Sequence, residues 1–543
     1  MKKTVTVEVL GITKEIAAGT TLLELSEDFE LQNQILLGKI NNQLQDLSKA
    51  ISEDAKIEFL DISSNYGFRT YQRSVIFLMV TAVKEILGKK TRVLVEHSIS
   101  KNIHCQIEDV KITPQLLEKI KERMILLSER DIAIEKISLP LEEAISLCAE
   151  FGLEDKIKNL HFRRTSSVSL YKLDWFYTYF YGELVPSTGY VKLFALSEDD
   201  DGFLLQCQDQ NNPENLREIT HLKKVSKIFR EANAWGKILS VDTVGALNQR
   251  ITKEGLGNII RINEALHEKK IAEIADQINE QCKKIVFIAG PTSSGKTTFA
   301  HRLGVQLRVN GLMPQVISLD NYYLDREFLP KDEFGQPNLE SITALDVPYI
   351  NSDVNRLLAG EKVDIPTLDF KQGKKVYKGD FLRLQKNSVL ILEGIHGLND
   401  RIGEGIEEKF RIFISALTQL NIDDHNRIPT SDTRLLRRIV RDAAFRGLDV
   451  RKNIAMWPSV QRGESTYIFP YQERADALFN SALVYEISIL KQYAEPLLFS
   501  IDKSMPEYTE ARRLVKFLDS FLGVSSEGVP QNSILREFIG NNV

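Results

Sequence analysis

The sequence predicts an α/β fold with a parallel sheet for the C-terminal half of the chain, and smaller β-containing units before it. Three short, mainly apolar runs support this prediction, at residues 285–289, 315–319 and 389–392. Such runs are typical of strands that are buried on both faces, as in a parallel sheet. Open α/β sheets bind their ligands at the carboxyl ends of their strands. We therefore expect the functional residues of this half to follow directly after its strands.

The first strand leads into a loop with the sequence GPTSSGKTT, residues 290–298, and a helix is predicted to begin after it. Such a loop lets backbone N–H groups close around phosphate oxygens, its lysine reaches the β- and γ-phosphates, and its threonine hydroxyl binds Mg²⁺. A glycine-rich turn that carries a lysine by chance is the alternative, but the strand–loop–helix context favours a phosphate site. We predict that ATP is bound by Gly290, Pro291, Thr292, Ser293, Ser294, Gly295, Lys296, Thr297 and Thr298, and Mg²⁺ by Thr297.

Two acidic residues follow the other predicted strands. Asp320 comes after the second strand and Glu393 after the third, so both are expected at the edge of the sheet that carries the phosphate loop. One general base and one metal ligand suit phosphoryl transfer, in which the protein mainly positions the reactants and neutralises charge. Either acid alone could instead cap a helix. The pair beside the phosphate loop predicts phosphoryl transfer rather than nucleotide binding alone.

A basic helix is predicted over residues 432–446. Its apolar residues recur at helical spacing, and four arginines three or four residues apart fall broadly on one side: Arg434, Arg437, Arg438 and Arg441. A solvated basic face, paired with Asp432 and Asp442, is one interpretation. The other is a lid whose guanidinium groups close over a transferring phosphate.

From about residue 283 to residue 500, these segments resemble the phosphoribulokinase/uridine kinase family. The resemblance rests on the phosphate loop, on residues 318–323, 338–346, 367–370 and 392–395, and on the run 432–449. It implies a P-loop kinase fold and an ATP- and Mg²⁺-dependent transfer to a hydroxyl of a nucleoside. It also implies that Asp320 is the base, that Glu393 helps to hold Mg²⁺ and that Asp346 holds ribose hydroxyls. The implied catalytic residues are Asp320, Lys296, Arg437, Arg438 and Arg441, and the implied substrate-binding residues are Tyr323, Asp346 and Asp369.

Three positions depart from the pattern of uridine kinases. Uridine kinases usually have an aromatic residue on each side of the aspartate at position 369, followed by a base-contacting histidine. This chain has Leu368, Asp369 and Phe370, and then Lys371, Gln372 and Gly373. Leu448 stands where an arginine is expected near the sugar. Because a site that hydrogen-bonds a base loses discrimination without those groups, the sequence leaves the acceptor open.

The N-terminal half resembles two domains of threonyl-tRNA synthetases. Residues 1–62 are similar to the β-grasp TGS domain, with strands predicted at 5–9, 14–16, 22–25 and 56–60. Residues 63–235 are similar to the α+β editing domain, with a helix over 71–87, a second helix opening near Pro114, and the turn 184–189. The synthetase domain uses two histidines and a Cys/His pair, and the aligned positions here hold Arg73, Phe77, Phe180 and Leu184. None of these side chains is an ordinary zinc ligand, so the resemblance implies a degenerate site without editing activity.

Other histidines do not restore a ligand set at a useful spacing in the sequence; these are His97, His104 and His161. The remaining shell could bind RNA, a nucleotide or the kinase domain. The net charge of −5 gives no general support for nucleic-acid binding. Any RNA contact would need a local patch, for which the candidates are Lys156, Lys158, Arg163, Arg164, Lys223 and Lys224.

The composition is that of a globular protein of several domains, with 43% hydrophobic and 27% charged residues. Its four scattered cysteines form no disulfide pattern, and no apolar run has transmembrane length, so we expect a cytoplasmic protein without membrane contact. A helical connector is predicted over 236–282, the kinase-like domain over 283–500, and a helical tail over 501–543 with apolar segments at 507–522 and 533–539. The oligomeric state stays open. The main alternative to a small-molecule kinase is a nucleotide-switched RNA- or tRNA-binding ATPase.

Overall fold

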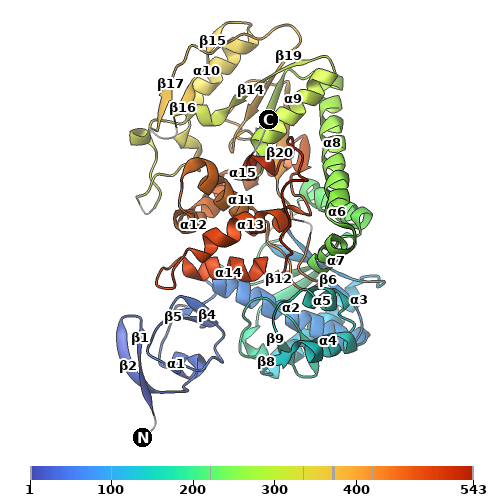
Figure 1. Ribbon diagram of the computed structural model, residues 1–543, viewed down its shortest axis with the longest axis vertical. Coiled ribbons are helices and arrows are strands. Elements are labelled where there is room, and N and C mark those ends of the chain that lie inside the picture. Colours follow the sequence, from blue (N-terminus) through green and yellow to red (C-terminus); the bar gives the residue numbers. More distant parts are fainter. Residues whose placement is uncertain are drawn as a thin grey trace.

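The computed structural model describes residues 3–99, 101–220, 222–333, 335–369, 373–418 and 420–540. The N-terminal half occupies one end of the molecule and the parallel sheet the other, with the helices of the C-terminal segment between them (Figure 1). Of the segment compared with the uridine kinase pattern, Phe370, Lys371 and Gln372 lie outside the described residues. Among the described helices, none has the length and apolar character that a membrane span requires.

The first unit is a five-stranded sheet in the order β2-β1-β5-β3-β4, in which β1 runs parallel to β5 and the other pairs are antiparallel. The predicted β-grasp arrangement is therefore present. Val5, Val7 and Val9 alternate into its core, as period-2 burial requires. The strands are β1 (Thr4–Val9), β2 (Ile12–Ala17), β3 (Leu37–Ile40), β4 (Gln43–Gln45) and β5 (Ala55–Leu60).

The strand predicted at residues 22–25 is wrong, because this segment forms helix α1 (Leu22–Ser26). Thr21 and Glu24 form a reciprocal capping box. The Thr21 hydroxyl accepts a hydrogen bond from the Glu24 N–H, and the Glu24 carboxylate accepts one from the Thr21 N–H at 2.8 Å. A segment of four residues with three leucines cannot distinguish a buried strand from a short buried helix, and here the cap decides.

The second unit packs the long helix α2 (Asn65–Leu87) and α3 (Pro114–Glu129) with two antiparallel sheets. One sheet has the order β11-β12-β7-β6 and the other β10-β9-β8. Pro114 is the first residue of α3, as the sequence indicated, and the Thr113 hydroxyl caps the helix. The remaining elements are β6 (Val93–Ile99), β7 (Asn102–Ile107), β8 (Ile134–Pro140), α4 (Leu141–Glu150), α5 (Glu154–Leu160), β9 (Ser167–Leu173), β10 (Phe176–Thr178), η1 (Thr188–Tyr190), β11 (Phe194–Asp199) and β12 (Gly202–Cys207).

Three helices connect the two halves: α6 (Lys223–Leu239), α7 (Val244–Glu254) and α8 (Gly257–Glu280). Sequence periodicity predicted only the last of them, from residue 258. Gly255, which interrupts the pattern, ends α7 with a φ of +74°, a conformation that suits glycine. The helix α8 lies along α9 of the C-terminal half (Figure 1), and Arg302 joins the two through Glu268 at 2.7 Å.

The C-terminal half is built on a five-stranded, fully parallel sheet in the order β14-β19-β13-β20-β21. Its central strand is β13 (Ile285–Ala289), which is completely buried, and α9 (Lys296–Val309) follows it. The three predicted strands thus become neighbours, and the predicted basic helix is α11 (Thr430–Arg441), followed by a π-helical turn (Asp442–Arg446). The other strands of the sheet are β14 (Met313–Ser318), β19 (Ser388–Glu393), β20 (Lys409–Ser415) and β21 (Ala477–Asn480).

Helices and small hairpins complete this half. They are η2 (Leu319–Tyr322), η3 (Arg326–Phe328), η4 (Ile342–Ala344), α10 (Val347–Leu358), β15 (Val363–Asp364), β16 (Thr367–Asp369), β17 (Lys374–Val376), β18 (Phe381–Leu382), α12 (Val450–Tyr467), η6 (Phe469–Arg474), α13 (Glu486–Phe499), α14 (Tyr508–Leu518) and α15 (Arg536–Ile539). The tail is docked, as its apolar residues predicted. Helix α14 reaches the first unit, where the Thr509 hydroxyl donates to the Asn42 carbonyl at 2.7 Å.

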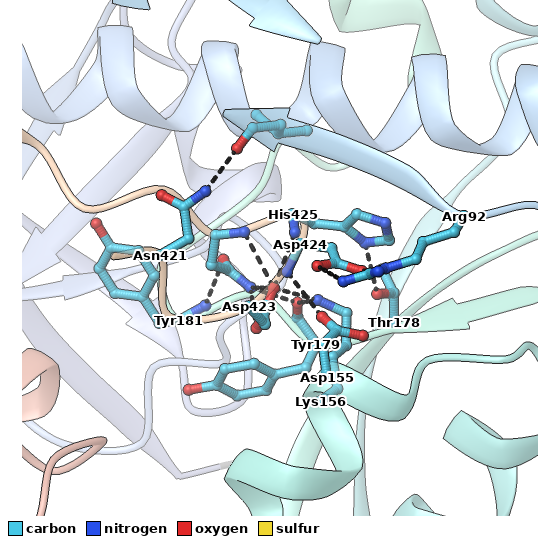
Figure 2. Close-up of polar contacts among 12 residues, drawn as sticks. Arg92, Asp155, Lys156, Thr178, Tyr179, Tyr181, Asn421, Asp423, Asp424 and His425 are labelled. Atoms are coloured by element: carbon cyan, nitrogen blue, oxygen red, sulfur yellow. Dashed lines mark hydrogen bonds and ion pairs between the residues drawn. The ribbon is translucent and has the colours of Figure 1, made fainter. Parts of the chain in front are cut away.

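A buried polar network joins the two halves at the loop between β20 and α11 (Figure 2). The Lys156 ammonium of α5 lies 2.5 Å from the Asp423 carboxylate, and neither side chain is exposed to solvent. The Arg92 guanidinium donates two hydrogen bonds, of 2.6 and 3.0 Å, to the Asp424 carboxylate, and the Asn421 amide donates to the Val95 carbonyl. The N-terminal half thereby holds the segment that leads directly into the arginine helix α11.

The same network corrects one prediction about RNA contact. Lys156 was a candidate for an RNA-binding patch, but its ammonium is enclosed between the halves and cannot reach a phosphate outside. Lys158, two residues along the same helix, is exposed. The spacing of positive charges in the sequence does not show which ones face the other half of the chain.

Candidate active site

The phosphate loop lies at the carboxyl end of β13, the central strand of the parallel sheet. Glycine is required at two of its positions. A Cβ at residue 290 would lie 2.1 Å from the Ile414 carbonyl oxygen, and Gly295 has a φ of +86°. Helix α9 begins at Lys296, so its positive end points into the loop. The predicted strand–loop–helix geometry is thus present, with the loop presented at the edge where open α/β sheets place their sites.

A cavity of about 1040 Å³ opens in front of this loop. It is large enough for a nucleotide together with a second small molecule, since ordinary ligand pockets measure about 300–1,000 Å³. Predicted site residues from four separate segments line it: Thr292, Ser293, Ser294, Gly295, Lys296, Thr297, Asp320, Tyr323, Glu393, Arg438 and Arg441. The predicted residues outside this lining are Gly290, Pro291, Thr298, Asp346, Asp369 and Arg437.

The two acids lie where β14 and β19 end. Glu393 is the last residue of β19, is 5% exposed, and accepts a hydrogen bond from the Thr297 hydroxyl at 3.3 Å. Burial raises the pKa of Glu393 to about 7, with the negative charge of Asp320 as the next cause, whereas the Lys296 ammonium acts in the opposite direction. A divalent cation would stabilise the ionised form of a buried carboxylate that lies next to a second negative charge.

The ammonium of Lys296 turns back onto its own loop. It donates to the carbonyl oxygens of Gly290 at 3.1 Å and Pro291 at 3.3 Å. Both acceptors are neutral carbonyl oxygens, so neither hydrogen bond pairs the ammonium with an opposite charge. A phosphate oxygen, which is charged, would be a stronger partner than either carbonyl.

Helix α11 divides its arginines between two tasks. Arg438 and Arg441 line the cavity; Arg438 donates to the Asn453 amide oxygen at 2.9 Å, and Arg441 pairs with Asp442 at 2.9 Å. Arg437 is fully buried, donates to the Glu486 carboxylate at 2.6 Å and stacks on the Phe538 ring.

Arg434 likewise serves the packing of this region, because it forms an ion pair with Glu464 while 3% exposed. The interpretation of the helix as a solvated basic face is therefore wrong. The buried pairs of Arg434 and Arg437 fix the helix, and the remaining two guanidinium groups reach the cavity.

Two of the residues that the kinase resemblance assigned to the substrate lie outside the cavity lining. Asp346 caps α10 by accepting from the Tyr349 N–H, and its other oxygen pairs with the Lys375 ammonium at 3.0 Å. Asp369 ends the short strand β16. Leu368, at the position of an expected aromatic residue, and Leu448, at the position of an expected arginine, both line the cavity.

The role of the C-terminal tail at this site was not predictable from the sequence. The Glu537 carboxylate of α15 accepts hydrogen bonds from the Thr298 N–H at 3.2 Å and from its hydroxyl at 3.0 Å. Ile534 packs so closely on the loop that a Cβ at Gly295 would lie 2.4 Å from it. An acidic side chain therefore occupies an anion-binding position at the start of α9, some 240 residues after that helix in the chain.

Glu340 is a second cavity residue that the sequence analysis did not identify. One of its carboxylate oxygens is buried without a hydrogen-bond partner among the described residues. Burial raises the pKa of Glu340 to about 7, and the nearby charge of Glu464 adds to this effect. Nothing in the local sequence indicates this, because the residues that surround Glu340 come from distant segments.

The positions that align with the synthetase editing site form an apolar core. Phe77 and Phe180 pack edge to face at 5.5 Å between ring centroids, and Leu184 is 1% exposed. Arg73 donates to the Glu183 carbonyl at 2.9 Å and packs against Gly182. Apolar side chains that fill this space leave no lone pairs to hold a metal or a water there.

Comparisons with known proteins find matches to two separate regions of the chain. The model of the family described as "Phosphoribulokinase / Uridine kinase family" matches residues 285–488. A uridine kinase of Halobacterium salinarum is 29% identical over 192 residues, 35% of this chain and 77% of that protein. A solved structure described as a possible uridine kinase of Bacillus stearothermophilus is 18% identical, covers 38% of this chain and 100% of its own, and has a TM-score of 0.26.

The other group of relatives matches the N-terminal region. A threonine–tRNA ligase of Syntrophotalea carbinolica is 29% identical over 193 residues, which are 34% of this chain. The chain spans only about 30% of the length of that ligase. Residues 285–488 thus form a domain of the phosphoribulokinase/uridine kinase family, which follows an N-terminal region similar to part of threonine–tRNA ligases.

Proposed function

We propose that this chain is an ATP- and Mg²⁺-dependent kinase that transfers the γ-phosphate to a hydroxyl of a nucleoside, uridine- or cytidine-like, or of a related small molecule. The observation that carries the proposal is that one cavity is lined by the phosphate loop, by Asp320 and Glu393, and by Arg438 and Arg441. Membership of the C-terminal domain in a kinase family supports it. Phosphoryl transfer needs mainly positioning and charge neutralisation, and this lining offers groups for both.

Each group has a proposed task. The Lys296 ammonium leaves its two loop carbonyls and follows the β- and γ-phosphates, and the Thr297 hydroxyl and the Glu393 carboxylate hold Mg²⁺. When bound, Mg²⁺ neutralises charge on the phosphate oxygens. The residues fit this ion, because the buried carboxylate of Glu393 lies in the field of the Asp320 charge, which a dication would offset. Asp320 accepts the proton of the attacking hydroxyl.

Among the arginines of α11, we assign the charge-stabilising role to Arg438 and Arg441. Both line the cavity, and guanidinium groups suit the equatorial oxygens of a transferring phosphoryl group. We leave Arg437 out of this set, since its ion pair with Glu486 is buried outside the lining. Its proposed role is to hold α11 in place.

The acceptor is proposed as a class, not as one compound. Tyr323 and Leu368 line the cavity beside Asp320, whereas Asp346 is occupied by Lys375. For Asp346 to bind ribose hydroxyls, this ion pair would have to open. With leucine at 368 and 448, base and sugar would be recognised by fewer hydrogen bonds than in a strict uridine kinase, which favours a broader acceptor range.

We further propose that the N-terminal half has lost editing chemistry and serves the kinase domain as a docked partner. The apolar filling at Phe77, Phe180 and Leu184 and the buried network around Asp423 support this role. We retain the predicted division into residues 1–62, 63–235, 236–282, 283–500 and 501–543 as the proposed domain boundaries.

A panel of nucleosides and sugars, each incubated with ATP and Mg²⁺ and the full chain, tests the proposal. We expect a phosphorylated nucleoside or close relative by mass spectrometry. A parallel arm replaces the acceptors with tRNA and measures ATP hydrolysis. Hydrolysis that RNA stimulates, with no phosphorylated acceptor in the panel, would favour the RNA-dependent ATPase and contradict the kinase.

A further inference from the structure

Two histidines of the second unit lie side by side on neighbouring strands. His97 of β6 and His104 of β7 are stacked, with 4.9 Å between their ring centroids, and Glu96 lies next to them. The sequence spacing of His97, His104 and His161 indicated no ligand set, but the fold brings the first two together beside Glu96. The chain reverses between antiparallel β6 and β7, whose register shifts between Val95 and Ser98, and this turn brings together residues that are seven positions apart.

The distances among the three side chains suit one metal ion. One carboxylate oxygen of Glu96 lies 3.2 Å from His104 Nδ1 and 3.6 Å from His97 Nδ1, and all three ligand atoms lie within 4.8 Å of one another. Zinc binds imidazole nitrogen and carboxylate oxygen at about 2.0–2.2 Å, so neighbouring ligands of a tetrahedral ion are about 3.4 Å apart. Two of the three separations are therefore close to those of a formed site.

The environment leaves one of these nitrogens without another task. His97 is 7% exposed, and among the described residues its Nδ1 has no hydrogen-bond partner. Its ring is held from the other side by Phe229 of α6, with 4.2 Å between centroids. A buried polar atom without a partner is costly, and a metal ion would satisfy it.

His104 is oriented as a metal-bound histidine is. Its Nδ1 faces Glu96, while its Nε2 faces the carboxylates of Asp201 at 3.5 Å and Asp199 at 3.8 Å. Ligating histidines usually direct their second nitrogen to a carboxylate or carbonyl, which fixes the ring and the tautomer. Gly202 allows this close approach, because a Cβ there would lie 2.9 Å from His104 Nε2.

We propose that Glu96, His97 and His104 form a binding site for a divalent transition metal of the Zn²⁺ type. Two imidazoles and one carboxylate are a ligand set that suits zinc, and the set is separate from the apolar positions that align with the synthetase editing site. Glu96 and His97 also line a cavity of about 520 Å³, which gives an ion access and a place for a water ligand.

The site lies where the two halves of the chain meet. The same cavity is lined by Phe229 and Ala232 of α6 and by Thr418, Asn421 and Asp424 of the kinase domain. An ion that fixes His97 also fixes the ring on which Phe229 rests. Metal binding is therefore expected to stabilise the contact between the halves as well as the β6–β7 pair.

The test measures Zn²⁺ binding to the full chain after chelation, by equilibrium dialysis with millimolar Mg²⁺ present to occupy sites of the kinase domain. We expect one Zn²⁺ per chain at micromolar free metal, and at least tenfold weaker binding in His97→Gln and in His104→Gln. His161→Gln is the matched control, because His161 is exposed, and it should bind like the wild type. Binding in that variant that falls as far as in the other two would contradict the assignment.

A second readout does not depend on the variants. Co²⁺ in place of Zn²⁺ should give the visible absorption of a tetrahedral ion with nitrogen and oxygen ligands, without the thiolate bands that binding at the exposed Cys282 would produce. A folded wild-type chain that retains no Zn²⁺, or Zn²⁺ retained equally by His97→Gln and His104→Gln, would overturn the proposal. A Co²⁺ spectrum with thiolate bands would also overturn it.

Discussion

Replacing Lys156 by methionine should weaken the contact between the two halves by a measurable amount. The ammonium lies 2.5 Å from the Asp423 carboxylate, both side chains are fully buried, and methionine fills a similar volume without the charge. The Asp423 carboxylate would keep hydrogen bonds from the N–H groups of His425 and Asn426, both at 3.0 Å, and from the Asn426 side chain. Among the described residues, Lys156 is the one cationic side chain that forms an ion pair with Asp423, and the substitution removes it.

The magnitude follows from this arrangement. Breaking a buried ion pair by removing one partner costs about 3–5 kcal/mol, because the remaining charge is buried and uncompensated. The retained N–H donors place Lys156→Met near the lower end, about 3 kcal/mol, or roughly two orders of magnitude in the equilibrium between docked and separated or unfolded states. Adding Asp423→Asn removes the orphan charge but keeps an oxygen for both backbone N–H groups. The double variant should therefore recover part of the loss.

Urea-induced unfolding of the full chain, followed by tryptophan fluorescence and circular dichroism, measures this difference. Lys158→Met on the same helix is the matched control, because Lys158 is exposed, and it should change the free energy of unfolding by no more than about 0.5 kcal/mol. If Lys156→Met behaves like this control, the buried pair does not hold the halves together. A double variant whose loss is the sum of the two single losses would refute the reasoning about the uncompensated charge.

Four further predictions follow from the kinase domain and the N-terminal half. Asp320→Asn should lower kcat by about two to four orders of magnitude with nearly unchanged ATP affinity, while Glu327→Gln, at an exposed position, should keep the wild-type kcat. Loss of ATP binding in Asp320→Asn would instead indicate that Asp320 holds the metal and that Glu393 is the base. Glu537→Gln should lower the KM for ATP about threefold to tenfold, because an anionic side chain no longer competes for the Thr298 N–H. Glu527→Gln in the same tail should leave the KM for ATP unchanged. An unchanged KM in Glu537→Gln would show that Glu537 does not face the nucleotide. Since the pKa of Glu340 is raised to about 7, the unfolded chain loses this proton first, and the wild type loses stability as pH rises from about 4.5 to about 8. Glu340→Gln should therefore be more stable than the wild type at pH 8, by up to about 3 kcal/mol, and equal to it near pH 4.5. A difference in thermal or urea unfolding that stays constant with pH would contradict the assignment. The full chain should not deacylate misacylated tRNA, because Phe77, Phe180 and Leu184 supply neither a base nor a metal-bound water, and measurable deacylation would show that the degenerate site is still active.

The features that the sequence predicted well are those whose backbone geometry is local. The phosphate loop needs glycine at 290 and 295 for reasons of close approach and positive φ, and a strand and a helix directly flank it. The acids at 320 and 393 follow strand ends, so the parallel sheet brings them together without further information. Helix α3 was predictable from Thr113 and Pro114 for the same reason.

The features that the sequence could not show depend on partners from distant segments. Arg437 and Arg438 are neighbours on one helix, yet one is buried against Glu486 and the other faces the cavity. Lys156 was a candidate for an RNA-binding patch, but the loop around Asp423 covers it. His97 and His104 become a pair only through the pairing of β6 with β7, and Glu537 reaches the phosphate loop only because the tail folds back.

Transfer of a labelled γ-phosphate from ATP, followed in a single turnover, tests the central claim most directly. The acceptor would be the best compound of the nucleoside and sugar panel, and the wild-type chain would be compared with Lys296→Ala, which removes the one lysine charge of the phosphate loop. We predict label on a hydroxyl of the acceptor with the wild type and none above background with a folded Lys296→Ala. Near-normal transfer by Lys296→Ala, or label released only as inorganic phosphate by the wild type, would contradict the account.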